Sequence, residues 1–156
     1  MKIVLLIGNE SKENIKNAIE YFIAYGYNDM ILFVSEPNEY FTTEEKFYYS
    51  SNGVKITLIK SLCNESTSQR LLFIKGSLEK RFLLVYSSKI INTDIDIPLS
   101  AHKEEEKIAT LLVYEEKMIA CILENEIFDY TSEQRSFEKE ILERVGQDLE
   151  LNQIIV

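Results

Sequence analysis

Short runs of consecutive apolar residues recur along the chain, and each run predicts a β-strand. Such runs are typical of strands buried on both faces, as in the middle of a parallel sheet. The continuous runs cover residues 2–7, 29–34, 81–86, 108–113 and 118–123. Two more strands are predicted. Apolar and polar positions alternate over residues 54–59, and apolar residues recur over residues 151–156 at the end of the given sequence.

Between the strands, apolar residues recur at three- and four-residue spacing, which places them on one face of a helix. This spacing predicts a short helix around residues 40–48 and longer ones over residues 13–25, 69–80, 97–107 and 132–145. Ser11 is expected to cap the first helix and Gly26 to end it. Because strands and helices alternate, the sequence predicts a single α/β domain over residues 1–156. The expected fold has three layers, with a mostly parallel sheet, a central first strand and helices on both faces.

The net charge, the first apolar run and the number of cysteines exclude several classes of function. The chain has 17 Lys and Arg residues against 26 Asp and Glu residues, and its net charge is -9. Binding to a nucleic-acid backbone needs a basic surface, so we expect no nucleic-acid partner. The apolar run in the first ten residues is too short for a signal peptide or a membrane span, so we expect a cytoplasmic protein without membrane contact. Cys63 and Cys121 are too few for a disulfide framework or a zinc site, and we expect reduced thiols.

The turn after the first strand lies where α/β folds bind phosphate groups, at the N-terminus of a helix. It reads Gly8-Asn9-Glu10-Ser11, so it has one glycine, and Glu10 and Glu13 bring negative charge to it. A phosphate-binding turn needs several glycines so that backbone amides can approach the anion. The residues alone therefore favour a plain strand-to-helix connection over a phosphate site.

Three titratable residues after the fourth strand are candidates for catalysis or metal binding. Asp94 and Asp96 either hold a divalent cation with their oxygens or face water and cap the next helix, and the residues favour the second interpretation. His102 is the only histidine, so a histidine-dependent catalytic triad would rest on it alone. Its charged neighbours predict an exposed helical face. These residues by themselves indicate no active site.

Several segments, taken in order, resemble the sugar-1-phosphate nucleotidylyltransferases, and among these most closely the glucose-1-phosphate cytidylyltransferases. The most specific segment covers residues 82–110, where FLLVYSS, TDIDI and AHKEEEKIAT are similar to the family's FLLTYGDG, DVDI and FHKxHGKxAT. Residues 67–71, TSQRL, are similar to TGGRL, which approaches the nucleotide base in the family. ENEIFDY and FEKEILERVGQDLEL also match family segments, so the likeness covers nearly the whole chain. It implies a Rossmann-like, nucleotide-diphospho-sugar transferase-like fold in a shortened form.

The chain departs from the family where the family binds phosphate and metal. The glycine-rich turn LAGGxGTRL is replaced by LIGNESKEN, which keeps only Gly8, followed by Asn9. Ser88 stands where the family has a magnesium-binding aspartate. The resemblance therefore implies a vestigial nucleotide-binding set of Gly8, Asn9, Arg70 and Ser88, with no catalytic residue and no cofactor.

Other family features are missing as well. Ser68 and Gln69 replace the glycines of TGGRL, the sugar-binding insertion between Tyr114 and Met118 is absent, and the sequence given has no second metal-binding aspartate. Nucleotidyl transfer needs Mg²⁺ and cationic groups to stabilise the developing charge. We therefore expect a catalytically inactive relative, which acts by binding or by protein contacts in carbohydrate-nucleotide metabolism. The alternative is an active sugar-phosphate nucleotidylyltransferase with Mg²⁺ in a rearranged site made by Asp94 and Asp96.

The shortened fold also bears on assembly. Loss of covering segments leaves apolar surface, which soluble monomers rarely expose in large patches. We therefore expect a homo-oligomer, with contacts from the aromatic residues between positions 40 and 49 and from Ile154, Ile155 and Val156. The other interpretation is that both segments pack onto their own core. A protein partner in carbohydrate biosynthesis is a further expectation.

Overall fold

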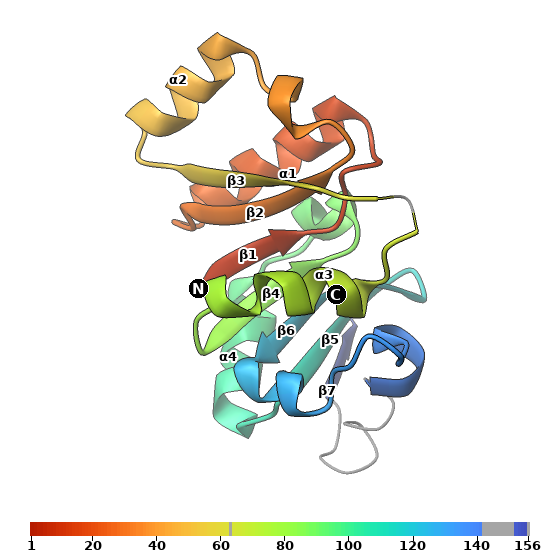
Figure 1. Cartoon of the computed structure of the whole chain (residues 1–156). Helices are drawn as coiled ribbons and strands as arrows, with labels where there is room; N and C mark the ends of the chain where they lie inside the picture. Colours follow the sequence, from red (N-terminus) through yellow and green to blue (C-terminus); the bar gives the residue numbers. More distant parts are fainter. Residues whose placement is uncertain (63, 142–151, 156) are drawn as a thin grey trace.

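A seven-stranded sheet, ordered β3-β2-β1-β4-β6-β5-β7, forms the centre of the computed structural model, which describes residues 1–62, 64–141 and 152–155 (Figure 1). The strands are β1 (Lys2–Leu5), β2 (Asp29–Val34), β3 (Lys55–Lys60), β4 (Arg81–Val85), β5 (Ala109–Tyr114), β6 (Lys117–Glu124) and β7 (Asn152–Ile155). Strands β1 to β4 are parallel to one another, as are β5 and β7, whereas β6 is antiparallel to β4 and β5. The predicted mostly parallel α/β sheet is confirmed, with β1 inside it between β2 and β4.

Helical segments cover both faces of this sheet. The α-helices are α1 (Lys12–Ala24), α2 (Thr43–Ser51), α3 (Thr67–Ile74) and α4 (Asp96–Glu105). Shorter helical turns are η1 (Pro37–Glu39), η2 (Lys75–Ser77), η3 (Ser88–Asn92), η4 (Asn125–Asp129) and the π-helical η5 (Phe137–Ile141). Because side chains alternate along a strand, Ile3 and Leu5 join the core under α1, α2 and α4, whereas Val4 joins the core under α3, η4 and η5.

Helix α1 illustrates how local sequence produces an element. The Ser11 hydroxyl accepts a hydrogen bond from the Asn14 amide at 3.2 Å, which satisfies an otherwise unpaired donor at the helix start. Gly26 follows the helix with φ of 83°, in the left-handed region that ends many helices. Both predicted end signals are therefore confirmed. Between these ends, the buried face comprises Ile15, Ala18, Ile19 and Phe22.

Some predicted boundaries differ from the structure. β1 ends at Leu5, and the Leu6 amide donates to the Val85 carbonyl at 2.8 Å as the chain leaves the strand. The helix predicted over residues 69–80 is α3 followed by η2. The helix predicted over residues 132–145 is a π-helical turn that begins at Phe137, after a turn closed by the Arg135 amide on the Ser132 carbonyl. Residues 142–145 of that prediction lie outside the described residues, as does Cys63.

The prediction that His102 lies on an exposed helical face is wrong, because His102 is completely buried. Helix α4 has few apolar residues, and its inner face is made by Pro98, Leu99 and His102. The imidazole hydrogen-bonds Thr110 Oγ1 through Nδ1 at 2.7 Å and Glu124 Oε1 through Nε2 at 2.9 Å. Glu124 also forms an ion pair with Arg81. These partners satisfy both ring nitrogens, which is what allows a polar ring to be buried there.

Strands β5 and β6 are joined by a two-residue turn at the position where the predicted family insertion is missing. Glu115 and Glu116 form this turn with φ values of 49° and 62°, both in the left-handed region. Tyr114 and Lys117 are paired across it, so the hairpin closes directly. No helix of the described residues has the length and apolar character that crossing a bilayer requires.

Candidate functional site

The strand order changes direction between β1 and β4. From β1 the chain continues to β2 and β3 on one side, while β4 lies on the other side. At such a switch point the loops after the two strands separate, which is where α/β sheets bind ligands. Here the segment after β1 carries Gly8, Asn9 and Glu10, and the segment after β4 carries Ser88.

A hydrogen-bonded bridge closes the switch point. The Glu10 carboxylate accepts from the backbone N–H of Ser88 at 3.1 Å through Oε1, and from the Ser88 hydroxyl through Oε2. The Ser88 side of the bridge is buried, with 8% of the residue exposed. Ser88 thus stands where the resemblance implies a metal-binding aspartate, and it donates both hydrogens to a carboxylate from the opposite loop.

The turn after β1 is tight and has a packing reason for its glycine. The Glu10 amide donates to the Ile7 carbonyl at 2.9 Å, which closes a β-turn over residues 7–10. A Cβ atom on Gly8 would lie 1.8 Å from the Phe33 carbonyl oxygen of β2. The close approach of the two backbones therefore requires glycine at this position, whether or not a ligand binds.

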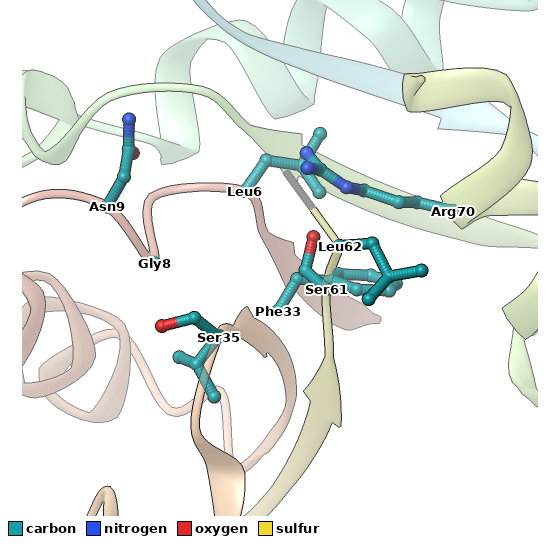
Figure 2. A pocket seen from close by; sticks show the side chains of 9 residues that line it. Leu6, Gly8, Asn9, Phe33, Ser35, Ser61, Leu62 and Arg70 are labelled. Carbon is teal, nitrogen blue, oxygen red and sulfur yellow. The ribbon is translucent and has the colours of Figure 1, made fainter. Parts of the chain in front are cut away.

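A cleft of about 350 Å³ lies beside this bridge, at the carboxyl ends of β1, β2 and β3 (Figure 2). It is lined by Leu6, Gly8, Asn9, Phe33, Val34, Ser35, Ser61, Leu62 and Arg70. Three of the four residues predicted from the resemblance, Gly8, Asn9 and Arg70, therefore lie together at one cleft, whereas Ser88 is not among the lining residues. Ser35 and Ser61 were missed by the sequence analysis. Their signal is their place directly after β2 and β3, because the carboxyl ends of parallel strands meet at one edge of the sheet.

Arg70 supplies the positive charge of the cleft. Figure 2 shows its side chain extending toward Leu6, and the centre of its guanidinium is 5.9 Å from the centroid of the Phe33 ring. Glu65 approaches the Arg70 Nε atom no closer than 4.0 Å, and that buried nitrogen has no hydrogen-bond partner among the described residues. Arg70 is therefore held over an aromatic ring with an unused donor.

Two residues beside Arg70, which the resemblance aligns with the glycines of TGGRL, stabilise the start of α3. The Gln69 side chain accepts from the Ser66 amide at 2.9 Å, and the Gln69 amide donates to the Ser66 hydroxyl at 3.2 Å, so the two form a capping box. The buried Ser68 hydroxyl donates to the Arg135 carbonyl at 2.8 Å. These contacts fix the start of the helix that carries Arg70.

The structure places Asp94 and Asp96 away from the cleft, at the start of α4. Asp94 Oδ1 accepts from the Asp96 amide at 3.2 Å and from the Tyr25 hydroxyl at 3.3 Å. The first contact is typical of a loop that leads into a helix, and the second ties this loop to the end of α1. In the part of the chain that the structure describes, no three His, Cys, Asp or Glu side chains are grouped so that they could hold a metal ion.

Comparisons with solved structures identify the fold. The chain is similar to a protein from Bacillus anthracis assigned as a glucose-1-phosphate thymidylyltransferase and solved with sucrose, with a TM-score of 0.67 and 11% identity over 99% of this chain and 86% of that one. HddC from Yersinia pseudotuberculosis gives a TM-score of 0.69 and 13% identity over 99% of this chain and 89% of that one. A protein from Desulfovibrio desulfuricans assigned as a nucleotide-diphospho-sugar transferase gives 0.55 and 8% over 99% of this chain and 79% of that one.

No protein-family model matches the sequence, and no curated protein matches it significantly. At identities this low, the likeness to solved structures shows the fold. The chain has a nucleotide-diphospho-sugar transferase-like fold, so the predicted resemblance to sugar-1-phosphate nucleotidylyltransferases is confirmed at the level of architecture.

Proposed function

We propose that this chain, which has the fold of the sugar-1-phosphate nucleotidylyltransferases, is catalytically inactive and binds a nucleoside-like ligand in the cleft beside Arg70. The hydrogen-bonded bridge between Glu10 and Ser88 is the observation that carries the proposal. We further propose that the protein acts by this binding, or through protein contacts, in carbohydrate-nucleotide metabolism.

The bridge opposes nucleotidyl transfer in two ways. A triphosphate at the switch point would meet the negative charge of Glu10, whereas catalysis of this reaction depends on positive charge at the reacting phosphate. The implied Mg²⁺ does not fit the residues either, because Ser88 offers a hydroxyl in place of a carboxylate and Glu10 already accepts two hydrogen bonds. Losing one electrostatic element of a transfer site typically costs about 10²–10³ in rate. The chain lacks several of these elements at once.

The cleft has the properties of a small-molecule site. Its volume of about 350 Å³ falls in the range of ligand pockets. Its lining combines apolar side chains with the neutral polar groups of Asn9, Ser35 and Ser61, and no carboxylate is among the lining residues. Phe33 and the guanidinium of Arg70 offer flat surfaces on which an aromatic base can stack. These features suit an uncharged ring with hydrogen-bonding edges better than a polyphosphate.

Titration calorimetry of the purified chain with cytidine, uridine, thymidine, adenosine and guanosine tests the binding proposal. We expect saturable heat with at least one nucleoside, and we expect R70M to weaken that binding by about tenfold. K46Q serves as the control, because Lys46 is an exposed residue of α2 remote from the cleft. Absence of saturable binding by all five nucleosides, or an equal loss in both variants, would contradict the proposal.

A turnover assay tests the proposed inactivity. The chain is incubated with Mg²⁺, each nucleoside triphosphate and glucose 1-phosphate, and pyrophosphate release is followed. We expect no release above the rate without protein. Pyrophosphate formation that D94A or D96A abolishes would establish the alternative, an active enzyme with a rearranged metal site.

The exposed aromatic residues support a homo-oligomer as the form in which the protein acts. Within the stretch of residues 40–49, Phe41 and Tyr49 are buried in the core, whereas Phe47 is 72% exposed and Tyr48 is 49% exposed. Part of the stretch therefore packs onto the chain's own core, and part of it is exposed. Aromatic residues are enriched at the centres of protein interfaces, so Phe47 and Tyr48 on α2 are the proposed contacts.

A further inference from the structure

A second cavity, of about 500 Å³, lies at the opposite end of the sheet from the cleft beside Arg70. Its lining residues are Met1, Tyr27, Glu79, Lys80, Arg81, Leu99 and Lys103. These residues precede or begin β1, β2 and β4, or lie on α4, so the cavity is at the amino ends of the parallel strands. Neither the nucleoside proposal nor the switch point involves this end of the molecule.

The charge of this cavity differs from that of the chain. Three of its seven lining residues, Lys80, Arg81 and Lys103, are cationic and one, Glu79, is acidic. The whole chain, in contrast, has a net charge of -9. Lys80 and Lys103 are exposed, and neither forms an ion pair within the described residues. Because Arg81 is paired with Glu124, the positive charge that remains at the cavity is that of Lys80 and Lys103, against Glu79, and in an otherwise acidic protein this favours an anionic ligand.

Contacts with the core hold the Arg81 side chain in place. Arg81 begins β4, and its Nε atom is bound to Glu124 Oε1, the same oxygen that the buried His102 ring contacts through Nε2. With Nε engaged, the two terminal nitrogens of the guanidinium are the Arg81 donors that a ligand of the cavity could use. The Asn125 amide donates to the Lys80 carbonyl at 2.7 Å and fixes the backbone beside Arg81. A guanidinium that is already oriented loses little conformational freedom when it donates hydrogen bonds to an oxyanion.

The uncharged lining residues indicate the chemistry of the ligand beyond its anionic group. Leu99 and Lys103 are four residues apart on α4, so they share one helical face. Tyr27 faces the same cavity, and burial raises its pKa above the ordinary value, so the phenol stays uncharged at neutral pH. An apolar side chain and an aromatic ring thus adjoin the cationic groups. This combination suits an organic molecule with one ionised group and one flat or apolar face.

We propose that the cavity at the amino ends of β1, β2 and β4 binds a small organic phosphate monoester, with Lys80, Arg81 and Lys103 around the phosphate and Tyr27 and Leu99 against the organic part. A phosphate monoester carries close to two negative charges at neutral pH and has three acceptor oxygens, which match two lysines and one guanidinium. The proposal does not depend on the nucleoside site.

Heteronuclear NMR titration at constant ionic strength tests this site, with phenyl phosphate, inorganic phosphate and benzoate as probes. We expect saturable shifts of residues around positions 27, 79–81 and 99–103 with phenyl phosphate. Inorganic phosphate, which lacks the ring, is expected to bind about tenfold more weakly, and benzoate, which carries a single charge, weaker still. Shifts that do not saturate, or shifts centred on the cleft beside Arg70, would overturn the proposal.

Matched variants separate the site from general attraction between charges. K80Q/K103Q removes two exposed lysines of the cavity, and K46Q/K55Q removes two exposed lysines elsewhere, so both lower the net charge equally. We expect the first variant to reduce the affinity for phenyl phosphate by about tenfold or more and the second to leave it unchanged. An equal effect of the two variants would overturn the proposal. R70M, which tests the nucleoside site, is expected to leave phenyl phosphate binding unaffected.

Discussion

Ser88 donates both its backbone N–H and its hydroxyl to the carboxylate of Glu10, a residue 78 positions earlier in the chain. The two side chains come from the loops after β1 and β4, which are neighbouring strands of the sheet. A carboxylate therefore takes the position at which related folds admit an anionic ligand. Under the proposed function, this contact keeps a polyphosphate from the switch point, and the cleft beside it stays available to a ligand.

Removing the charge of Glu10 is expected to change which ligands are accepted. E10Q keeps the shape of the side chain and removes one negative charge beside the cleft. We expect the affinity for a nucleoside triphosphate, relative to its nucleoside, to rise about fivefold or more, because a like-charge repulsion is lost. Calorimetry with both ligands measures the ratio. E13Q, which changes an exposed glutamate in the first turn of α1, is the control. An equal ratio in wild type and E10Q would refute the proposed role of the bridge.

The packing of Gly8 predicts a large loss of stability on substitution. G8A places a methyl group 1.8 Å from the Phe33 carbonyl oxygen, so the first turn or β2 must move. We expect the free energy of unfolding in urea to fall by about 2–4 kcal/mol. A Cβ atom on Gly76 meets nothing within 4 Å, and its φ is not in the left-handed region, so G76A is the control. Its effect is expected to stay within about 0.5 kcal/mol. Similar values for the two variants would contradict the close approach.

In the turn between β5 and β6, introducing a glycine is expected to stabilise the protein. Glu116 has φ of 62°, which costs a residue with a side chain about 1 kcal/mol relative to glycine. We therefore expect E116G to raise the free energy of unfolding by about that amount. E105G, the same exchange in the last turn of α4, is expected to lower it by about 0.5–1 kcal/mol. Urea titrations of the two variants give the signs directly, and a destabilised E116G would mean that the turn is not left-handed.

The buried His102 predicts a pH dependence of stability. Burial lowers the pKa of His102 below its ordinary value of 6.5, and this effect exceeds the opposite influence of Glu124. As the pH falls through 6.5, the unfolded chain therefore takes up a proton that the folded chain does not. We expect stability to be full above that pH and to fall below it, with a limiting slope of about 1.4 kcal/mol per pH unit.

Urea unfolding at intervals between about pH 7.5 and pH 5.5 measures this loss. H102Q is expected to be less stable at the upper limit, because Gln cannot reproduce both ring contacts, and to show a flatter curve below it. No other histidine titrates in this range, because His102 is the only one in the chain. Parallel curves for the two proteins would show that His102 is not the source.

Assembly is tested by light scattering. If Phe47 and Tyr48 form the proposed contact between copies, the mass at tens of micromolar protein exceeds the 18.2 kDa of one chain. F47S/Y48S is expected to restore the mass of a monomer at little cost in stability, since Phe47 is largely exposed and Tyr48, whose ring contacts Tyr49, is half-exposed. F73S changes another exposed aromatic residue, on α3, and serves as the control. A wild-type mass that stays at 18.2 kDa would refute the homo-oligomer.

The sequence by itself determined the features that depend on neighbouring residues. The apolar run of β2 and the spacing of Ile15, Ala18, Ile19 and Phe22 in α1 specify elements whose buried faces are local patterns. The Ser11 cap acts within one helical turn, so its partner is near in sequence. The resemblance to a known family predicted the fold as well, because the matching segments occur in the same order along the chain and that order implies the same order of strands and helices.

Tertiary structure decided what depends on residues far apart in the sequence. The charges beside His102 favour exposure, but Thr110 and Glu124 satisfy both its nitrogens inside the core. Which aromatic residues between positions 40 and 49 are buried depends on how this segment packs against the rest of the fold. Glu10 and Ser88 carry no local signal of their contact, and the place of Ser35 and Ser61 after a strand does not reveal that Arg70 lines the same cleft. Contacts of this kind arise because the sheet brings the carboxyl ends of separate strands to one edge, and hydrogen bonds between them depend on distances that only the assembled sheet sets.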